Sequence, residues 1–98
     1  MDTLSHEELI AYLNAETAKL SWKELEPHFA RGSVIHLAPG YDLVDIAAAM
    51  VRDDRSIVFP LLENKLLGKV TDEQAQGFSE DSLFWGVVIA PWVLIQSL

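Results

Sequence analysis

Cysteine is absent from this 98-residue chain, and positive charge is scarce. Without cysteine there is no disulfide framework, no thiol nucleophile and no thiolate metal site, and a cysteine-free chain fits a reducing cytoplasm. Seven Lys and Arg face fifteen Asp and Glu, for a formal net charge of −8, and the basic residues are scattered between Lys19 and Lys69. Nucleic acids and anionic membrane surfaces attract clustered Lys and Arg. We therefore expect neither kind of partner, and we expect a cytoplasmic protein.

Glycine is also scarce, and long apolar runs are missing. Five glycines form no Gly-rich phosphate loop, and no G-x-S-x-G nucleophile motif is present, so we expect no nucleotide cofactor. Acidic residues near the start of the chain do not fit a signal peptide. The apolar run Leu83–Ile95 is shorter than the roughly 20 residues of a spanning helix and contains Gly86 and Pro91. This run predicts a buried strand.

Half of the residues are hydrophobic and 22% are charged, which predicts a single globular domain over 1–98. Three S/T-x-x-E/Q patterns, starting at Ser5, Ser21 and Thr71, are typical of helix N-termini, because the hydroxyl and the Glu or Gln side chain each cap a free N–H. Asp42 is a suitable N-cap for a further helix. Together with apolar stripes of helical period, these signals predict helices over 6–19, 22–31, 43–52, 57–66 and 71–80.

The region 53–69 is ambiguous. Ser56 suits the cap of a helix over 57–66, although Ser56–Phe59 also fits a short strand, and we favour the helix. Gly32 is expected to have positive φ, closing the helix before it, and Pro39-Gly40 predicts a turn.

Two segments read as strands, about 33–38 and about 85–97. The second has apolar residues in both alternation classes and no charge, so we expect both of its faces to be covered. The resulting fold class is α+β, with four or five short helices packed on a small sheet formed by these two segments. We favour antiparallel pairing of these two segments because antiparallel pairs are more common in proteins, and parallel pairing remains an alternative. The predicted core comprises Leu9, Leu13, Trp22, Leu25, Phe29, Ile35, Leu43, Ile46, Met50, Leu62, Trp85, Val88 and Leu94.

Four motifs resemble a family of small bacterial proteins known as domain of unknown function 2288. They are Asn14–Trp22, Asp42–Asp45, Lys69–Ala75 and Trp85–Gln96, of which the Ala90-Pro91-Trp92-Val93-Leu94 ending is the most specific. The resemblance spans nearly the whole chain. It implies a stand-alone bacterial cytoplasmic protein, and it implies no activity, substrate or catalytic residue.

Of the three histidines, only His36 has another candidate functional residue close in sequence, because its strand leads through Pro39-Gly40 to the helix start at Asp42. Loops at strand ends often carry functional residues, so we keep His36 as a candidate beside the more common structural role of a strand histidine. Asp42 and Asp45 lie three residues apart on one helical turn. Two carboxylates without a third make a poor cation site, so we expect no metal.

Glu16, Trp22 and Trp92 complete the candidate residues. Glu16 and Lys19 are spaced to pair at i, i+3 on the first helix, in the densest polar and aromatic cluster of the chain. For both tryptophans a core role competes with a recognition role.

These features favour a small non-catalytic interaction or regulatory module over an enzyme, and they identify no partner or pathway. The alternative is a small enzyme or ligand-binding protein that uses a pocket near His36 and Asp42. The uncharged C-terminal strand also predicts a homodimer built on that segment, because a long apolar strand needs a cover on each face and a neighbour along each edge. Another protein partner is compatible with the same strand.

Overall fold

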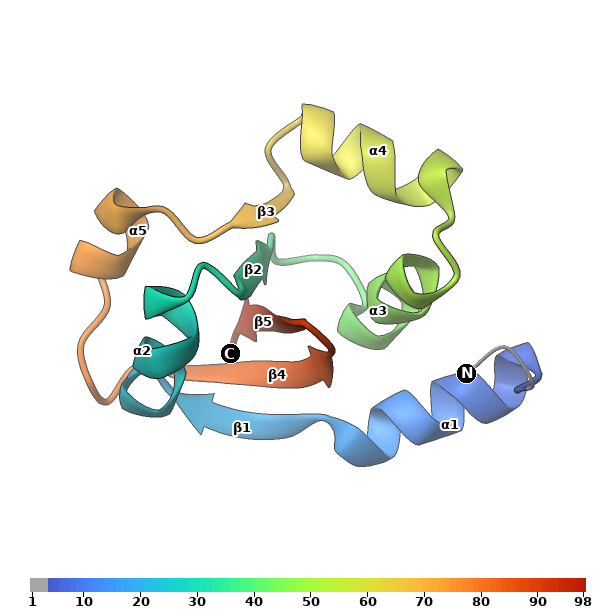
Figure 1. Cartoon of the computed structure of the whole chain (residues 1–98), viewed down its shortest axis with the longest axis horizontal. Coiled ribbons are helices and arrows are strands. Elements are labelled where there is room, and N and C mark those ends of the chain that lie inside the picture. Colours follow the sequence, from blue (N-terminus) through green and yellow to red (C-terminus); the bar gives the residue numbers. More distant parts are fainter. Residues whose placement is uncertain (1–3) are drawn as a thin grey trace.

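The computed structural model describes residues 4–98, which form five α-helices and five β-strands (Figure 1). The helices are α1 His6–Glu16, α2 Trp22–Ala30, α3 Leu43–Val51, α4 Arg55–Glu63 and α5 Asp72–Gln76; the strands are β1 Ala18–Ser21, β2 Val34–Leu37, β3 Leu67–Lys69, β4 Leu83–Ile89 and β5 Trp92–Ser97. The chain is an α+β protein, as its sequence predicts. None of the helices within 4–98 combines the length and apolar character needed to cross a bilayer.

The five strands form one mixed sheet in the order β1-β4-β5-β2-β3. The segment predicted as one strand over 85–97 is a hairpin: β4 and β5 pair antiparallel from Phe84↔Ser97 to Ile89↔Trp92. Pro91 lies in the turn, where its missing N–H costs no ladder bond. The predicted strand 33–38 corresponds to β2, which pairs with β5, so both predicted strand segments belong to the sheet.

The favoured antiparallel pairing of these two segments is wrong. β2 pairs with β5 in parallel, with Ile35 opposite Leu94. Because the hairpin reverses the chain at Pro91, β5 runs in the same direction as β2 while β4 runs against it. Two edge strands were also missed: β1 pairs with β4, and β3 pairs with β2, both antiparallel. They have only four and three residues, too few for a clear alternation pattern.

Helix starts follow the sequence closely. All three predicted capping boxes are present, at Ser5, Ser21 and Thr71, and the carboxylate of Asp42 caps α3 by accepting from the N–H of Asp45. The exception is α4, which begins at Arg55 after Asp54 and has no side-chain cap bond. The predicted cap Ser56 lies inside this helix instead.

The C-terminal ends of the helices differ more from the sequence prediction than their starts do. α1 ends at Glu16, three residues before the predicted end, because the following residues pair with β4. α5 ends at Gln76 instead of near residue 80. Gly32 has φ +70° and Gly40 has φ +95°, which confirms the predicted helix closure and turn.

The two faces of the sheet carry separate cores. Strand alternation places Val87 and Leu94 on one face, where α1, α3 and α4 cover them, while Phe84, Val93 and Ile95 lie on the other face beneath α2 and α5. Figure 1 shows α1, α3 and α4 gathered toward one end of the sheet and α2 toward the other. Each face is therefore covered over a different part of its length.

Most of the predicted core is buried, with Phe29 and Met50 partly so. Three predicted core residues are exposed, namely Leu62 at 44%, Trp85 at 39% and Val88 at 61%. Trp85 and Val88 lie on β4 where the covering helices do not reach, and Leu62 faces outward on α4. Amino-acid type alone could not separate these positions from their buried neighbours.

Candidate functional site

A hollow of the described chain lies between α1, α3 and the turn of the β4–β5 hairpin. We call it the hairpin cleft; its volume is about 620 Å³, and it is lined by Tyr12, Leu13, Glu16, Met50, Val51, Val88, Ile89, Ala90 and Trp92. This size is typical of small-molecule sites, which range over roughly 300–1,000 Å³. The cleft unites two of the six candidate residues, Glu16 and Trp92, which are 76 positions apart in the chain.

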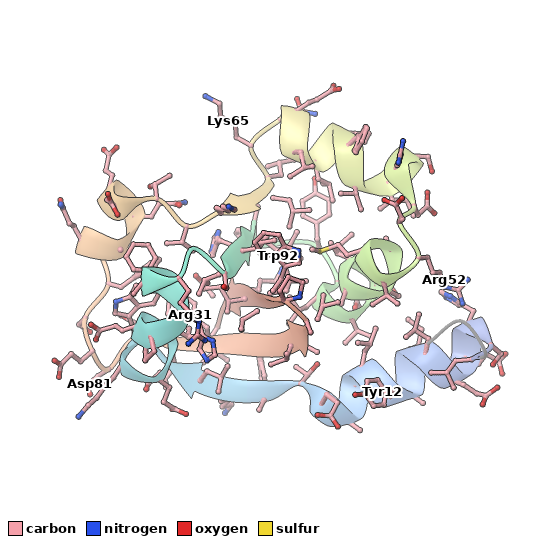
Figure 2. All side chains as sticks on the ribbon, viewed as in Figure 1. Tyr12, Arg31, Arg52, Lys65, Asp81 and Trp92 are labelled. Carbon is pink, nitrogen blue, oxygen red and sulfur yellow. The ribbon has the colours of Figure 1, made fainter. Side chains whose placement is uncertain are left out.

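The local sequence explains how the cleft forms. The capping box at Ser5 starts α1, which buries Leu13 and turns Tyr12 and Glu16 toward its exposed side. The tight turn at Ala90 and Pro91 then places Trp92 at the start of β5. Figure 2 shows Tyr12 on α1 and Trp92 at the middle of the sheet.

Among the residues that the structure describes, Glu16 is the only charged side chain that lines the hairpin cleft. Among the residues described, the sole ion pair joins Arg55 to Asp53, so this carboxylate has no cationic partner there. The predicted helical pairing of Glu16 with Lys19 is wrong, because α1 ends first and Lys19 lies in β1, with its Nζ 5.3 Å from the ring centroid of Trp85. Trp92 has a similar neighbour, the Nζ of Lys69 at 5.2 Å from its ring centroid.

His36 lies in a second, more open cleft of about 510 Å³ beside β3. Its neighbours there include Lys65, Lys69, Thr71 and Gln74, and no carboxylate lines this cleft. Burial lowers the pKa of His36 from its ordinary value, because a half-buried imidazolium loses hydration. Thr71 and Gln74 are already engaged in the capping box of α5.

Asp42 does not line the cleft that contains His36, so the predicted pocket shared by these two residues does not form. The Asp42 Oδ1 atom accepts from the N–H of Asp45 at 3.0 Å. These acids therefore act as the N-terminal cap of α3. Within residues 4–98, no group of three or more His, Asp or Glu side chains is arranged to hold a metal ion.

Trp22 is a core residue. It is 5% exposed and packs against the rings of Phe29, Phe78 and Phe84, with centroids 4.9–6.2 Å apart. A smaller hollow lies beside it, lined by Glu26, Asp72 and Gln76 as well.

An exposed apolar surface lies on the part of the sheet that α1, α3 and α4 leave uncovered. Alternation along β4 puts Leu83 and Trp85 on this face, and Leu98 lies beside Leu83 because the preceding residue pairs with Phe84. Gln96, directly opposite Trp85, donates through Nε2 to the carbonyl oxygen of Tyr41 at 2.8 Å. We call this surface the C-terminal face; it comprises Tyr41, Leu83, Trp85 and Leu98, which are 39–56% exposed.

Comparison with known proteins agrees with the sequence motifs. The sequence model of the family described as protein of unknown function (DUF2288) matches residues 8–97. The chain belongs to this family. Membership in DUF2288 confirms the resemblance carried by the four motifs, and it adds no activity.

A solved structure is similar to this DUF2288 chain in both fold and sequence. PA1075 from Pseudomonas aeruginosa, determined by NMR in solution, superposes with a TM-score of 0.80 and is 43% identical. The match covers 99% of this chain and 90% of that chain. Among curated proteins, none matches the chain.

Sequence reasoning missed most of the residues that build these surfaces. Tyr12 and Met50 lie on helices whose apolar stripes were read only as core, although Tyr12 falls beside the buried stripe of α1. Tyr41 directly follows the predicted Pro39-Gly40 turn, and residues beside surface turns are commonly exposed, so this position in the sequence could have marked Tyr41 as a surface residue.

Proposed function

We propose that this protein is a non-catalytic interaction or regulatory module of the bacterial cytoplasm that works as a homodimer through its C-terminal face. The observation that carries the proposal is the exposure of Leu83 and Trp85 on β4, together with Tyr41 and Leu98 in the segments beside the sheet. Aromatic and large aliphatic side chains are typical of interface centres, from which Asp and Glu are depleted. Two of these four residues are aromatic, and none is charged.

Charge supports a second copy as the occupant. The chain carries a net charge of −8, so two copies repel each other wherever carboxylates would meet. The strand residues next to the C-terminal face are uncharged except Lys19, which lies over the Trp85 ring. A two-fold axis through this face brings the same apolar residues together from both copies.

The hairpin constrains which part of the C-terminal segment can serve as the interface. β4 lies between β1 and β5, and β5 lies between β4 and β2, so Phe84–Gly86 of β4 and Val93–Ile95 of β5 are paired on both edges. The contact between copies therefore uses side chains that project from the sheet face. Burying large exposed aromatics at such a contact is the main source of affinity.

Sedimentation equilibrium on Trp85→Glu and Val88→Glu tests the proposal. Both residues are exposed on β4, but they project from opposite faces of the sheet, so the variants add the same charge to the same strand. The wild type and Val88→Glu should form dimers at micromolar concentration, and Trp85→Glu should be monomeric with an unchanged circular dichroism spectrum.

A monomeric wild type at concentrations far above micromolar would refute the homodimer. Dimers of Trp85→Glu as stable as those of the wild type would refute the C-terminal face as the interface.

A further inference from the structure

The hairpin cleft combines an apolar lining with a single negative charge. Its side chains come from three elements: Tyr12, Leu13 and Glu16 from α1, Met50 and Val51 from α3, and Trp92 with its neighbours from the hairpin. Tyr12 and Val88, at its mouth, are both exposed. Concave apolar sites with a few placed polar groups are the usual form of small-molecule sites.

The charge pattern selects the kind of ligand. Glu16 contributes the one carboxylate of the cleft, without a cationic partner in the described part of the chain. Within residues 4–98, no Lys, Arg or His lines the cleft, so an anionic ligand would face Glu16 without a compensating positive charge. The net charge of −8 adds a general attraction for cations.

The aromatic side chains strengthen this selection. Trp and Tyr rings attract cations within about 6 Å of the ring centroid. The Lys69 ammonium already lies over the Trp92 ring, 5.2 Å from its centroid, so Trp92 offers a ligand apolar surface and not a free site for its charge. Tyr12 supplies a second ring, together with a hydroxyl that can accept from an N–H donor.

From these features we propose that the hairpin cleft binds a small amphipathic cation, an organic ammonium whose apolar body packs on Met50, Val51 and Trp92 while its charged end lies near Glu16. The site is separate from the C-terminal face. Cation binding in the cleft does not require a dimer, and a dimer formed through the C-terminal face does not require cation binding. Each proposal can therefore be refuted without refuting the other.

Three probes with the same body and different head groups test the proposal: 4-phenylbutylamine, 4-phenylbutanol and 4-phenylbutanoate. Each is titrated into the ¹⁵N-labelled full chain while amide and indole NMR signals are followed. The amine should shift the indole signal of Trp92 and the amides of Met50 and Ala90. The alcohol should bind more weakly, and the carboxylate should be the weakest of the three.

Glu16→Gln is the decisive variant, and Glu7→Gln is its matched control. Both remove one carboxylate from α1 and change the net charge equally, but only Glu16 lines the cleft. Glu16→Gln should weaken amine binding about two- to fivefold, the range expected for an exposed charge contact, and leave alcohol binding unchanged. Glu7→Gln should bind the amine like the wild type.

Several results would overturn the proposal. They are the absence of shifts at millimolar amine, shifts that map away from the cleft, equal binding of all three probes, or an unchanged amine affinity in Glu16→Gln. Equal weakening in both variants would also overturn it, since attraction would then come from the overall charge.

Discussion

The two faces of the sheet hold cores of different chemistry. On one face the buried residues are all aliphatic, and Ala47 and Ala48 let α3 approach the strands closely. On the other face Trp22, Phe29, Phe78 and Phe84 form a cluster of tilted and edge-to-face rings. The aliphatic core joins three helices and stabilises through apolar area and close packing. The aromatic core uses fewer, larger side chains, which add specific ring contacts to area burial.

The helices of the aliphatic core leave parts of the sheet exposed. The aliphatic core ends before Trp85, so the C-terminal face is exposed on its side of the sheet. The hairpin cleft lies toward the other end of β4, and Leu13, Met50, Val51, Ile89 and Trp92 of its lining belong to or pack against the same aliphatic cluster. Both proposed binding surfaces therefore lie at the ends of the aliphatic core. Helices that do not cover the whole length of a short sheet leave such exposed regions at its ends.

The largest expected effect comes from truncation in the aliphatic core. Leu13→Ala should lower the free energy of unfolding by about 2–5 kcal/mol, and Ile46→Ala should do the same, because cavities form where side chains are fully packed. Urea denaturation gives both values. Leu62→Ala is the control: it truncates a leucine that is 44% exposed and should cost less than about 1 kcal/mol. Similar losses in all three variants would contradict the observed helix faces.

In the aromatic core, Phe84→Leu should cost about 1–3 kcal/mol, because it keeps an apolar side chain and removes ring contacts worth roughly 0.5–1.5 kcal/mol each. The ring of Phe84 lies 4.9 Å from that of Phe78 and 6.2 Å from that of Trp22, centroid to centroid. The matched control is Phe59→Leu, at a phenylalanine that is 49% exposed. Equal unfolding midpoints for the two variants would mean that the ring contacts contribute nothing beyond area.

Helix caps distinguish the two sides at a smaller scale. Ser21 caps α2 on the aromatic side through a complete capping box, whereas Asp54 makes no cap bond to α4 on the aliphatic side. Ser21→Ala should therefore lower the free energy of unfolding by about 1 kcal/mol. Asp54→Ala should lower it by less than about 0.5 kcal/mol, through the lost charge at the helix N-terminus. Thermal or urea unfolding of both variants checks this order, and a larger loss for Asp54→Ala would reverse it.

The smallest effect is the pH dependence contributed by His36, which lies on the same sheet face as the aromatic core. Burial lowers its pKa in the folded protein below the ordinary value of 6.5. The unfolded chain then binds the proton more tightly than the folded protein. Neutral His36 therefore does not lower the free energy of unfolding above pH 6.5, and the free energy of unfolding falls as the pH drops from 6.5 toward the folded pKa. His36→Gln should flatten the dependence of unfolding free energy on pH between 7.5 and 5. His6→Gln, which removes an exposed imidazole, should parallel the wild type; a wild-type slope in His36→Gln would show that other groups cause it.

Helix closures show where sequence reasoning loses information. Gly32 was expected in the left-handed region because glycine is the usual residue there, and it is. Asp53 and Lys65 close α3 and α4 with φ +54° and +59°, and neither could be anticipated from its residue type. In each case the N–H of the next residue donates to a carbonyl five positions earlier, Asp54 to Ala49 and Leu66 to Leu61. These hydrogen bonds offset the backbone strain.

Among the candidate functional residues, roles that depend on neighbours in sequence were predictable, and contacts that depend on the fold were not. The cap role of Asp42 was visible in the sequence because it depends on residues three positions apart. The meeting of Glu16 with Trp92 was not visible, because it depends on how α1 lies against the hairpin. The expected pocket joining His36 and Asp42 failed for the converse reason. They are only six positions apart in sequence, but the side chain of His36 lies on the face of the sheet opposite to that of Ile35 and Leu37, which pack with α3.

By itself the sequence determined the α+β class, the starts of four of the five helices, the turn glycines and most of the aliphatic core. These features depend on interactions within a few residues, such as a hydroxyl reaching an N–H three positions on, or on the helical period of apolar side chains. The tertiary structure alone decided the parallel pairing of β2 with β5, the two short edge strands, and the exposure of Trp85 and Val88. Strand partners and burial depend on contacts between distant segments, and identical side chains on one strand become core or surface according to which helix covers them.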